Sequence, residues 1–378
     1  MKNIIDYEFI IIGSGVVGLA IARELALNKF KSVLIIERNS SFGQETSSRN
    51  SQVIHSGIFN NINSKKFYHC IRGKKLLYNF LEEYSLEYEQ TEKIIISKAS
   101  ELQAFNKLVR NIELKGIPFS FISKNELSKI EPYIISDNSL LIHDSGILDA
   151  HKFMHQLYQI SNLHHDYLFN SNVEDIKYFD DHFNVCITEQ NGNLENISCK
   201  YLINSAGLSS FDIAKKLMGK QLKINSQKFY KGSYFKLSSK NRNKFKKLIY
   251  SLPSYKDSLG IHISFDNQKI PRLGPDYHEV DCSNGYDYSV NNDSKNDFFC
   301  SAAEYIKDLN IEELTEDFSG IRPKLFFDGK INSEYYIQEE SSNNFKGMIN
   351  LIGIDSPGLT SSISIANEVV TKLKGIPK

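Results

Sequence analysis

The N-terminal part of the chain carries a hydrophobic pattern that predicts a strand, a helix and a second strand. Phe9 to Ile12 form a continuous apolar run rich in β-branched residues, as expected of a strand buried on both faces. The pattern then predicts a helix over residues 16–27 and a second strand over residues 32–36. This order is typical of an α/β fold with a parallel sheet.

Three glycines lie at the turn between the first strand and the helix. Gly13, Gly15 and Gly18 form G-x-G-x-x-G, in which the glycines allow a sharp turn, close approach to a pyrophosphate, and tight helix–strand packing. The helix N-terminus offers free N–H groups and a positive dipole end to phosphates. Glu37 ends the second strand 24 positions after Gly13, near the ~20 expected for a carboxylate that binds a ribose hydroxyl. The unit therefore predicts a dinucleotide site, and Glu37 disfavours NADP because a 2′-phosphate would lie against its carboxylate.

The pattern after Glu37 favours FAD over NAD. An NAD enzyme normally continues with further strand–helix units, whereas this chain enters a Ser/Thr/Gln-rich loop and then a helix-like stretch over residues 64–85. Two distant segments, residues 200–219 and 347–374, each have the pattern of a strand followed by a helix. They supply the missing parts of a split nucleotide fold. The last helix would offer backbone donors to an anion, such as the negative end of a reduced flavin.

Composition sets broader limits. A length of 378 residues suggests two domains, and the equal numbers of Lys+Arg and Asp+Glu, 45 each, give no global basic field for nucleic acid. The five cysteines are scattered and form no C-x-x-C pair, which argues against disulfides and against a metal site, and favours the cytoplasm. The apolar start follows two acidic residues and is shorter than a spanning helix. We therefore expect a soluble protein, with peripheral contact to the inner face of a membrane left open.

Six stretches, in order along almost the whole chain, carry a resemblance to a known family. They are NSQVIHSGIF (50–59), IEPYI (130–134), SGILDA (145–150), LGIHISFDNQKIPRLGPD (259–276), SGIRPKL (319–325) and DSPGLTSSISIANEV (355–369). The chain resembles the FAD-dependent oxidoreductases of the D-amino-acid oxidase superfamily, and within it the L-2-hydroxyglutarate dehydrogenase (oxidase) family. Three positions depart from that family's pattern: Phe59 stands where a Tyr is usual, Ser264 where a Thr is usual, and Asp276 where an Asn is usual. The segment 281–297 matches nothing in it.

The resemblance implies an α/β (α+β overall) architecture of two domains. The first is a Rossmann-like FAD-binding domain of the glutathione-reductase type, formed by residues 1–88, 142–224 and 318–378. The second is a substrate domain with a mixed or antiparallel sheet, formed by residues 89–141 and 225–317.

The resemblance also implies which residues contact FAD. The loop after Glu37 would pass along the pyrophosphate and the ribityl chain and bring His55 to the edge of the flavin, while Val173 would give a backbone contact to adenine. The full expected cofactor set is Gly13, Gly15, Val17, Gly18, Glu37, Arg38, Thr46, Ser47, Asn50, Ser51, Val173, Ala206, Gly207, Gly358, Leu359 and Thr360.

The implied reaction is oxidation of a small 2-hydroxy acid, with L-2-hydroxyglutarate as the first choice of substrate. Its hydroxyl proton needs an acceptor, for which neutral His is suited, and its carboxylate needs a cation, for which the Arg fork is suited. We expect His55 or His262 to accept the proton and Arg322 to bind the carboxylate. Lys324 and Arg272 are candidates for the second cation that a dicarboxylate needs. Arg322 has a structural alternative, an ion pair with Asp317 or Glu316 nearby in the sequence.

Other functions stay open at the level of sequence. Relatives with this fold oxidise amines such as glycine, sarcosine or a D-amino acid, and the SSRNSQVIHSG stretch also resembles flavin-linked glycerol-3-phosphate dehydrogenases. Those enzymes carry Arg where Phe59 stands. A non-catalytic, partner-dependent flavoprotein is a further alternative. Oxygen, a quinone or an electron-transfer protein would each serve as electron acceptor.

Overall fold

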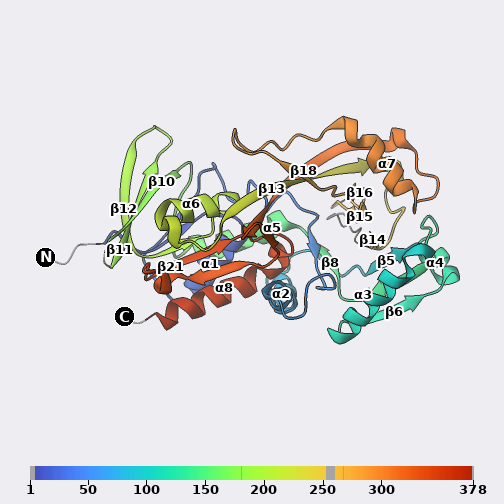
Figure 1. The fold of residues 1–378 in the computed structure, drawn as a ribbon, viewed down its shortest axis with the longest axis horizontal. Helices are drawn as coiled ribbons and strands as arrows, with labels where there is room; N and C mark the ends of the chain where they lie inside the picture. Colours follow the sequence, from blue (N-terminus) through green and yellow to red (C-terminus); the bar gives the residue numbers. More distant parts are fainter. Residues whose placement is uncertain (1–4, 180, 253–259, 267, 377–378) are drawn as a thin grey trace.

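The computed structural model describes residues 5–179, 181–252, 260–266 and 268–376. Two parts lie side by side along the long axis of the molecule, and both ends of the chain lie in the same part (Figure 1). That part contains an eight-stranded sheet, and the other contains a ten-stranded sheet. Within the stretch 259–276, Leu259 and Asn267 lie outside the described residues.

The eight-stranded sheet contains the first predicted strand–helix–strand unit. Its strands are β1 (Tyr7–Ile12), β2 (Val33–Ile36), β9 (Asp166–Leu168), β10 (Asn172–Phe179), β11 (His182–Thr188), β12 (Leu194–Asn204), β20 (Tyr336–Glu339) and β21 (Met348–Ile352). Pairing within β21-β12-β1-β2-β9 is parallel, and β10 and β11 extend β12 as an antiparallel meander. The two distant segments expected to complete the nucleotide fold supply β12 and β21, so that prediction is confirmed.

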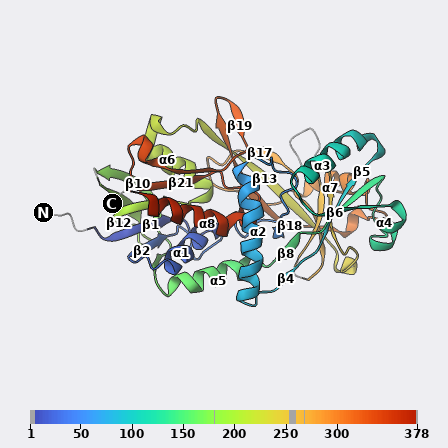
Figure 2. The ribbon, with the colours of Figure 1, turned by 90° about the horizontal axis from the view of Figure 1, so that it is seen from below.

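Helices cover both faces of this parallel core. They are α1 (Val16–Leu27), α2 (Lys65–Glu83), α5 (Ala150–Asn162), α6 (Ser210–Met218) and α8 (Gly358–Gly375). Phe9 and Ile11 pack in one hydrophobic cluster with residues of α1, α2, α5 and α8, whereas Ile10 and Ile12 pack in another with α6. Alternate residues of β1 thus face opposite layers, which explains why the strand is apolar throughout. Seen from below, α2 lies between the two parts (Figure 2).

The ten-stranded sheet forms the second part. In spatial order its main path is β19 (Lys330–Asn332), β18 (Leu314–Phe327), β13 (Ser226–Leu237), β16 (Pro271–Gly274), β15 (His262–Phe265), β14 (Leu248–Ser251), β5 (Lys93–Ser97), β7 (Asn138–Ile142) and β6 (Phe119–Ile122), with β17 (His278–Val280) beside β13. Its helices are α3 (Leu102–Leu114), α4 (Lys124–Ile130) and α7 (Lys295–Ala303). A small sheet of β3 (Val53–Ile54), β8 (Gly146–Leu148) and β4 (Tyr88–Glu89) completes the strands of the described residues.

The predicted division at residue 318 differs from the sheets by part of a strand. It falls inside β18, which continues to Phe327 while pairing with β13, and β19 follows in the same sheet. The sheet of the substrate domain therefore extends to Asn332, and the chain returns to the first sheet only at β20. A change of sheet leaves no mark in a continuous β-rich sequence, so the pattern alone could not place it.

Candidate active site and cofactor pocket

The glycine-rich turn is fixed by close contacts that exclude a side chain. Gly13 has a φ of +94°, and a Cβ there would lie 2.7 Å from the carbonyl oxygen of Ser205. A Cβ on Gly18 would lie 2.0 Å from the carbonyl oxygen of Gly13. Gly13 thus permits the turn and Gly18 permits close packing of α1 on β1, the two roles that the motif predicts.

Glu37 is held in a defined orientation at the end of β2. One carboxylate oxygen accepts hydrogen bonds from the backbone N–H and the hydroxyl of Ser14, both at 2.9 Å. The other accepts from the backbone N–H of Asn39 at 2.9 Å and from its side-chain amide at 3.0 Å. These four hydrogen bonds orient the carboxylate at the wall of the pocket, where the motif predicts an acceptor for a ribose hydroxyl.

One pocket is lined both by residues of this turn and by residues of the second sheet. Fourteen of the sixteen expected cofactor residues lie on its wall: Gly13, Gly15, Val17, Glu37, Arg38, Thr46, Ser47, Asn50, Ser51, Val173, Ala206, Gly207, Gly358 and Leu359. His55, His262 and Arg322 lie on the same wall. Gly18 and Thr360 do not line it. Thr360 instead accepts a hydrogen bond from the backbone N–H of His55 at 3.1 Å, so it positions the loop that carries the histidine.

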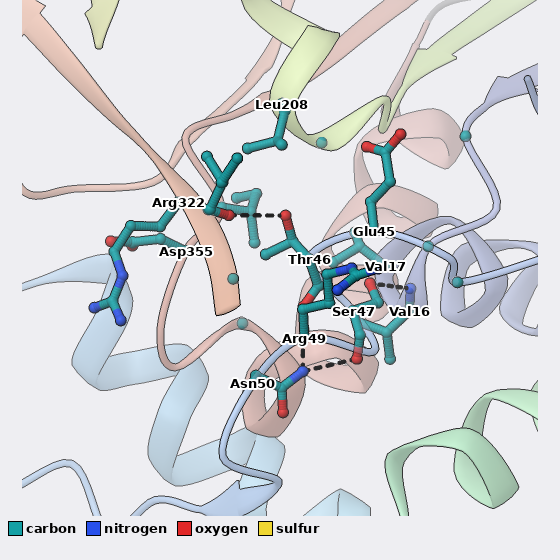
Figure 3. A pocket seen from close by; sticks show the side chains of 18 of the residues that line it. Val16, Val17, Glu45, Thr46, Ser47, Arg49, Asn50, Leu208, Arg322 and Asp355 are labelled. Atoms are coloured by element: carbon teal, nitrogen blue, oxygen red, sulfur yellow. Dashed lines mark hydrogen bonds between the residues drawn. The ribbon is translucent and has the colours of Figure 1, made fainter. Parts of the chain in front are cut away.

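The loop after Glu37 is tied to both parts of the molecule (Figure 3). Ser47 accepts a hydrogen bond from the N–H of Val16 at 3.0 Å, Asn50 donates to the Ser47 carbonyl at 2.7 Å, and Thr46 donates to the Ile321 carbonyl of β18 at 3.0 Å. These bonds draw the loop against the start of α1 on one side and against β18 on the other. Residues 46–50 therefore form the inner surface of the pocket between the two sheets.

The segment 281–297, for which the sequence suggested no role, lies over this loop. The Tyr288 ring covers the guanidinium of Arg49, with 4.1 Å from the ring centroid to Cζ, and the Tyr286 ring lies 5.2 Å from Cζ of Arg38. The Ser319 hydroxyl donates to the Tyr288 carbonyl at 2.8 Å. Residues 283–290, which we call the strap, thus hold two pocket arginines in place.

The residues of the pocket fit FAD. Gly13 provides the tight turn at the helix N-terminus, and Glu37 provides the acceptor. Among the described residues, Nε of Arg49 and the hydroxyl of Tyr288 are buried without a hydrogen-bond partner, although buried polar groups are normally paired. A cofactor with phosphates and hydroxyls meets these requirements along one wall of the pocket.

The other end of the pocket is formed by one face of the ten-stranded sheet. Ile249 of β14 pairs with Ile263 of β15, and Phe235 packs on Phe298 of α7 with 4.7 Å between ring centroids. Because neighbouring residues of a strand point to opposite faces, the face away from α7 carries Tyr234, Tyr250 and His262 toward the pocket.

His262 is buried and stacked on a tyrosine. Its ring lies 3.8 Å from the Tyr250 ring, centroid to centroid, at an interplanar angle of 9°. Neither ring nitrogen has a hydrogen-bond partner among the described residues, although the residue is only 2% exposed. Burial, followed by the charges of Lys93, His55 and Arg322, holds the pKa of His262 well below its usual range.

His55 faces the same end of the pocket from the small sheet. Burial lowers its pKa to about 3, and the charges of Lys93 and Arg322 contribute. Two neutral imidazoles therefore lie close to each other at working pH. A neutral imidazole accepts a proton, so both predicted candidates have the chemical form that the implied reaction needs.

Arg322 is the cation of this end of the pocket. No ion pair involves it among the described residues, and its guanidinium lies 5.8 Å from the Tyr277 ring centroid. Asp317, the alternative partner expected from the sequence, pairs with Arg272 instead. Lys324 pairs with the buried Asp355 at 2.6 Å. Lys66 also pairs with Asp355, so Lys324 shares this single carboxylate with a second lysine. The role of Lys324 or Arg272 as a second cation stays a prediction.

The departures from the family pattern have different surroundings. Phe59 is partly buried against the hydrophobic cluster of the ten-stranded sheet. The Ser264 hydroxyl is buried without a partner among the described residues. Asp276 accepts a hydrogen bond from the N–H of Ser233 at 2.5 Å, and burial raises its pKa. Phe59 and Asp276 thus both make contacts within the second part of the molecule, one by packing and one by a hydrogen bond.

Sequence reasoning missed three residues of this region: Tyr234, Tyr250 and Lys93. Burial raises the pKa of both tyrosines, and Ser51 lowers it in each case as a hydrogen-bond partner. Lys93 lies in the run KIIIS, which has the pattern of a buried strand. A lysine at the start of such a run is the only signal that the sequence offered.

The comparisons with known proteins agree with this geometry. The family described as FAD dependent oxidoreductase (DAO) matches residues 8–371. The chain belongs to this family. It is a FAD-dependent oxidoreductase.

The proteins and solved structures that are similar to this DAO-family chain carry the names of enzymes with different substrates. The mitochondrial L-2-hydroxyglutarate dehydrogenase of Arabidopsis thaliana is 34% identical, over 97% of this chain and 83% of that protein. A glycerol 3-phosphate dehydrogenase of Caloramator mitchellensis is 27% identical, over 98% and 75%. The FAD-bound L-alpha-glycerophosphate oxidase of Mycoplasma pneumoniae superposes with a TM-score of 0.82 at 22% identity, over 97% of this chain and 94% of that one. Glycine oxidase of Geobacillus kaustophilus does so with 0.82 at 17%, over 98% and 95%. The two structures confirm the fold.

No helix of the described residues combines the length and the apolar character needed to cross a bilayer. Within the same part of the chain, no cluster of three or more His, Cys, Asp and Glu side chains has the arrangement of a metal site.

Proposed function

We propose that this FAD-dependent oxidoreductase oxidises a small 2-hydroxy acid, with L-2-hydroxyglutarate giving 2-oxoglutarate as the best candidate. The observation that carries the proposal is the pairing of two neutral imidazoles with an arginine that has no carboxylate partner among the described residues, all at one end of the pocket. The relative at 34% identity, a L-2-hydroxyglutarate dehydrogenase, supports the choice of substrate.

Arg322 binds the substrate carboxylate in this proposal. Its planar fork matches a carboxylate with two parallel hydrogen bonds, and its position on β18 fixes the guanidinium at the wall of the pocket. Burial of the site strengthens this attraction, because little water screens it. The substrate is thereby held with its α-carbon directed away from β18 and toward the centre of the pocket.

His262 or His55 accepts the hydroxyl proton as the substrate is oxidised. Both imidazoles are neutral, and His262 has both ring nitrogens available. FAD, when bound, supplies the oxidising power by accepting the hydride from the α-carbon. The chain's own contribution is to neutralise the carboxylate, remove the proton and keep water out of the reaction.

The test is anaerobic bleaching of the flavin by single substrates. The substrates are L- and D-2-hydroxyglutarate, lactate, glycerol 3-phosphate, glycine, sarcosine and D-alanine. We expect L-2-hydroxyglutarate to bleach the flavin fastest and to yield one equivalent of 2-oxoglutarate. Bleaching by glycerol 3-phosphate or by an amine, with no response to hydroxy acids, would replace this proposal with the corresponding activity. No response to any of them would indicate a partner-dependent flavoprotein.

The reoxidation of the enzyme is tested separately. The reduced protein is mixed with oxygen, with a soluble quinone or with an electron-transfer flavoprotein, and the return of flavin absorbance is recorded. The acceptor that restores it fastest identifies the class of electron acceptor.

A further inference from the structure

One charged residue near the proposed active site is buried without an ion pair. Lys93 is 1% exposed, and no ion pair involves it among the described residues. Cys70 and Asp144, which pairs with Lys74, favour the charged form of Lys93, but they do not offset the cost of burial. A buried ammonium group without a counter-ion is costly, so it is normally kept for a function. Burial lowers the pKa of Lys93 to about 8, which leaves it charged at neutral pH.

The ammonium group lies against the ring on which His262 is stacked. Nζ of Lys93 is 4.1 Å from the centroid of the Tyr250 ring. The His262 ring already covers one face of Tyr250 at 3.8 Å. The ammonium therefore lies at the opposite face, and the three groups form a stack in the order Lys93, Tyr250, His262.

The strand register builds this stack. β5 and β14 pair in parallel, with Lys93 opposite Leu248 and Ile95 opposite Tyr250. Ile249 pairs with Ile263 in the antiparallel β14–β15 pair, which places Tyr250 across from His262. Three adjacent strands thus fix the order of the groups, and the cation–π contact holds the tyrosine ring in its orientation.

We propose that Lys93 is a positioning residue for the reaction: through Tyr250 it orients the His262 ring and keeps it in the neutral, proton-accepting form. This inference rests on the proposed role of His262. Protonation of His262 would bring a second positive charge to the Tyr250 ring, which already contacts the ammonium group of Lys93. Lys93 does not line the pocket, so it acts through Tyr250 and not by contact with the substrate.

Burial is the largest cause of the lowered pKa of His262, and Lys93 is the largest of the charges that lower it further. Facing His262 are Tyr250 from β14, Lys93 from β5, His55 from the loop after β3 and Arg322 from β18. In the proposed reaction Arg322 is neutralised by the substrate carboxylate. The negative charge of a bound substrate would favour protonation of His262. The positive charge of Lys93, on the other side of the Tyr250 ring, opposes that protonation.

The first test is a histidine titration that needs no substrate. The holoenzyme carries ¹³C at histidine Cε1, and His262→Asn assigns the resonance of His262. We expect the wild-type ring to remain neutral down to pH 5, and the apparent pKa of His262 to rise by about one unit in Lys93→Met. Unchanged titration in Lys93→Met, or a wild-type His262 that protonates between pH 6 and pH 7, would overturn the proposal.

The second test follows flavin reduction by the substrate from pH 4 to pH 9. In Lys93→Met we expect the acid limb of the rate to lie about one pH unit higher, so the rate on that limb falls about tenfold. Lys93→Arg should restore the wild-type limb, and Lys107→Met, which removes an exposed lysine of α3, should match wild type. A role in packing alone predicts that the profiles of Lys93→Met and wild type superimpose.

The two tests separate the inference from the proposed function. If no hydroxy acid reduces the flavin, the proposed function fails, while the histidine titration still decides the role of Lys93. Lys93→Met should fold and bind FAD, because it replaces a buried charge with an apolar chain of similar length, and its thermal midpoint should rise. A fall in the midpoint would indicate that the ammonium group stabilises the fold, and would contradict the argument from burial.

Discussion

The two ends of the pocket are built in different ways. The nucleotide end uses backbone groups, glycines and one carboxylate, most of them close together in the sequence around β1, α1 and β2. The substrate end uses side chains from β5, β14, β15 and β18 and from the loop after β3, which meet only in the folded sheet. The glycine turn and Glu37 of the proposed nucleotide end therefore follow mostly from local sequence, whereas the residues of the proposed substrate end are brought together by the tertiary structure.

The difference extends to the charges. Glu37 at the nucleotide end is surrounded by hydrogen-bond donors and accepts from all of them. His55 and His262 at the substrate end have low pKa values, because burial and nearby cations oppose protonation. One end is thus preorganised for binding and the other for proton transfer, so changes at each should have separable effects.

The largest expected effect is at the nucleotide end. In Gly13→Ala the new methyl group meets the Ser205 carbonyl, and the residue must keep a φ of +94°. We expect FAD affinity to fall by roughly 100-fold, equal to about 2.7 kcal/mol. The ratio of flavin to protein absorbance in the purified protein measures it. Gly192→Ala is the control, because Gly192 also has a positive φ, +83°, but nothing lies within 4 Å of a Cβ placed there. Equal loss of flavin in both variants would show that the close contacts of the glycine turn are not needed for FAD binding.

Arg322→Met should separate substrate binding from cofactor binding. The charged hydrogen bonds that it removes are worth about 1.5–3 kcal/mol each, so KM should rise roughly 100-fold while the flavin content stays at the wild-type level. Steady-state kinetics with the substrate identified by flavin bleaching provide the measurement. Arg110→Met, which removes an exposed arginine of α3, should leave KM unchanged. A KM within a few-fold of wild type in Arg322→Met would rule out the carboxylate role.

A smaller effect is expected where the strap links the two ends. Tyr288→Leu removes the ring that lies over Arg49, a cation–π contact of about 1–2 kcal/mol when desolvated. FAD should dissociate roughly tenfold faster, as followed by exchange with a fluorescent flavin analogue. Ser283→Ala, in an exposed part of the strap, is the matched control. Equal dissociation rates in the two variants would show that the strap has no part in holding the cofactor.

The smallest effect concerns the support of the substrate end. Glu131 accepts hydrogen bonds at 2.7 Å from the N–H groups of Lys246 and Lys247, just before β14. Burial raises its pKa to about 7, above the value in an unfolded chain, so its contribution to stability is present at low pH and is lost as pH rises through 7. Between pH 6 and pH 8 the wild type should lose about 1 kcal/mol more than Glu131→Gln. Chemical denaturation at both pH values measures the difference, and parallel pH dependences would exclude this role.

The sequence predicted the nucleotide end well because its determinants are local. The helix over 16–27, the glycine turn and Glu37 follow from periodicity and spacing within one strand–helix–strand unit. His55, His262 and Arg322 came from the resemblance, and the structure brings them together on one wall. Arg272 and Lys324 were candidates for a second cation, and only the fold shows that Arg272 pairs with Asp317 and that Lys324 shares Asp355 with Lys66. Tyr250 and Lys93 were missed because cross-strand register, and not sequence distance, places them beside His262.

The central claim is that neutral imidazoles at the sheet end of the pocket carry out the proton transfer of a 2-hydroxy acid oxidation. Single-turnover flavin reduction in flavin-loaded His262→Asn and His55→Asn, at saturating substrate, tests it most directly. The account predicts full flavin content in both, with reduction slowed roughly 100-fold in at least one, the usual size of a general-base contribution. Wild-type rates of reduction in both variants would contradict it.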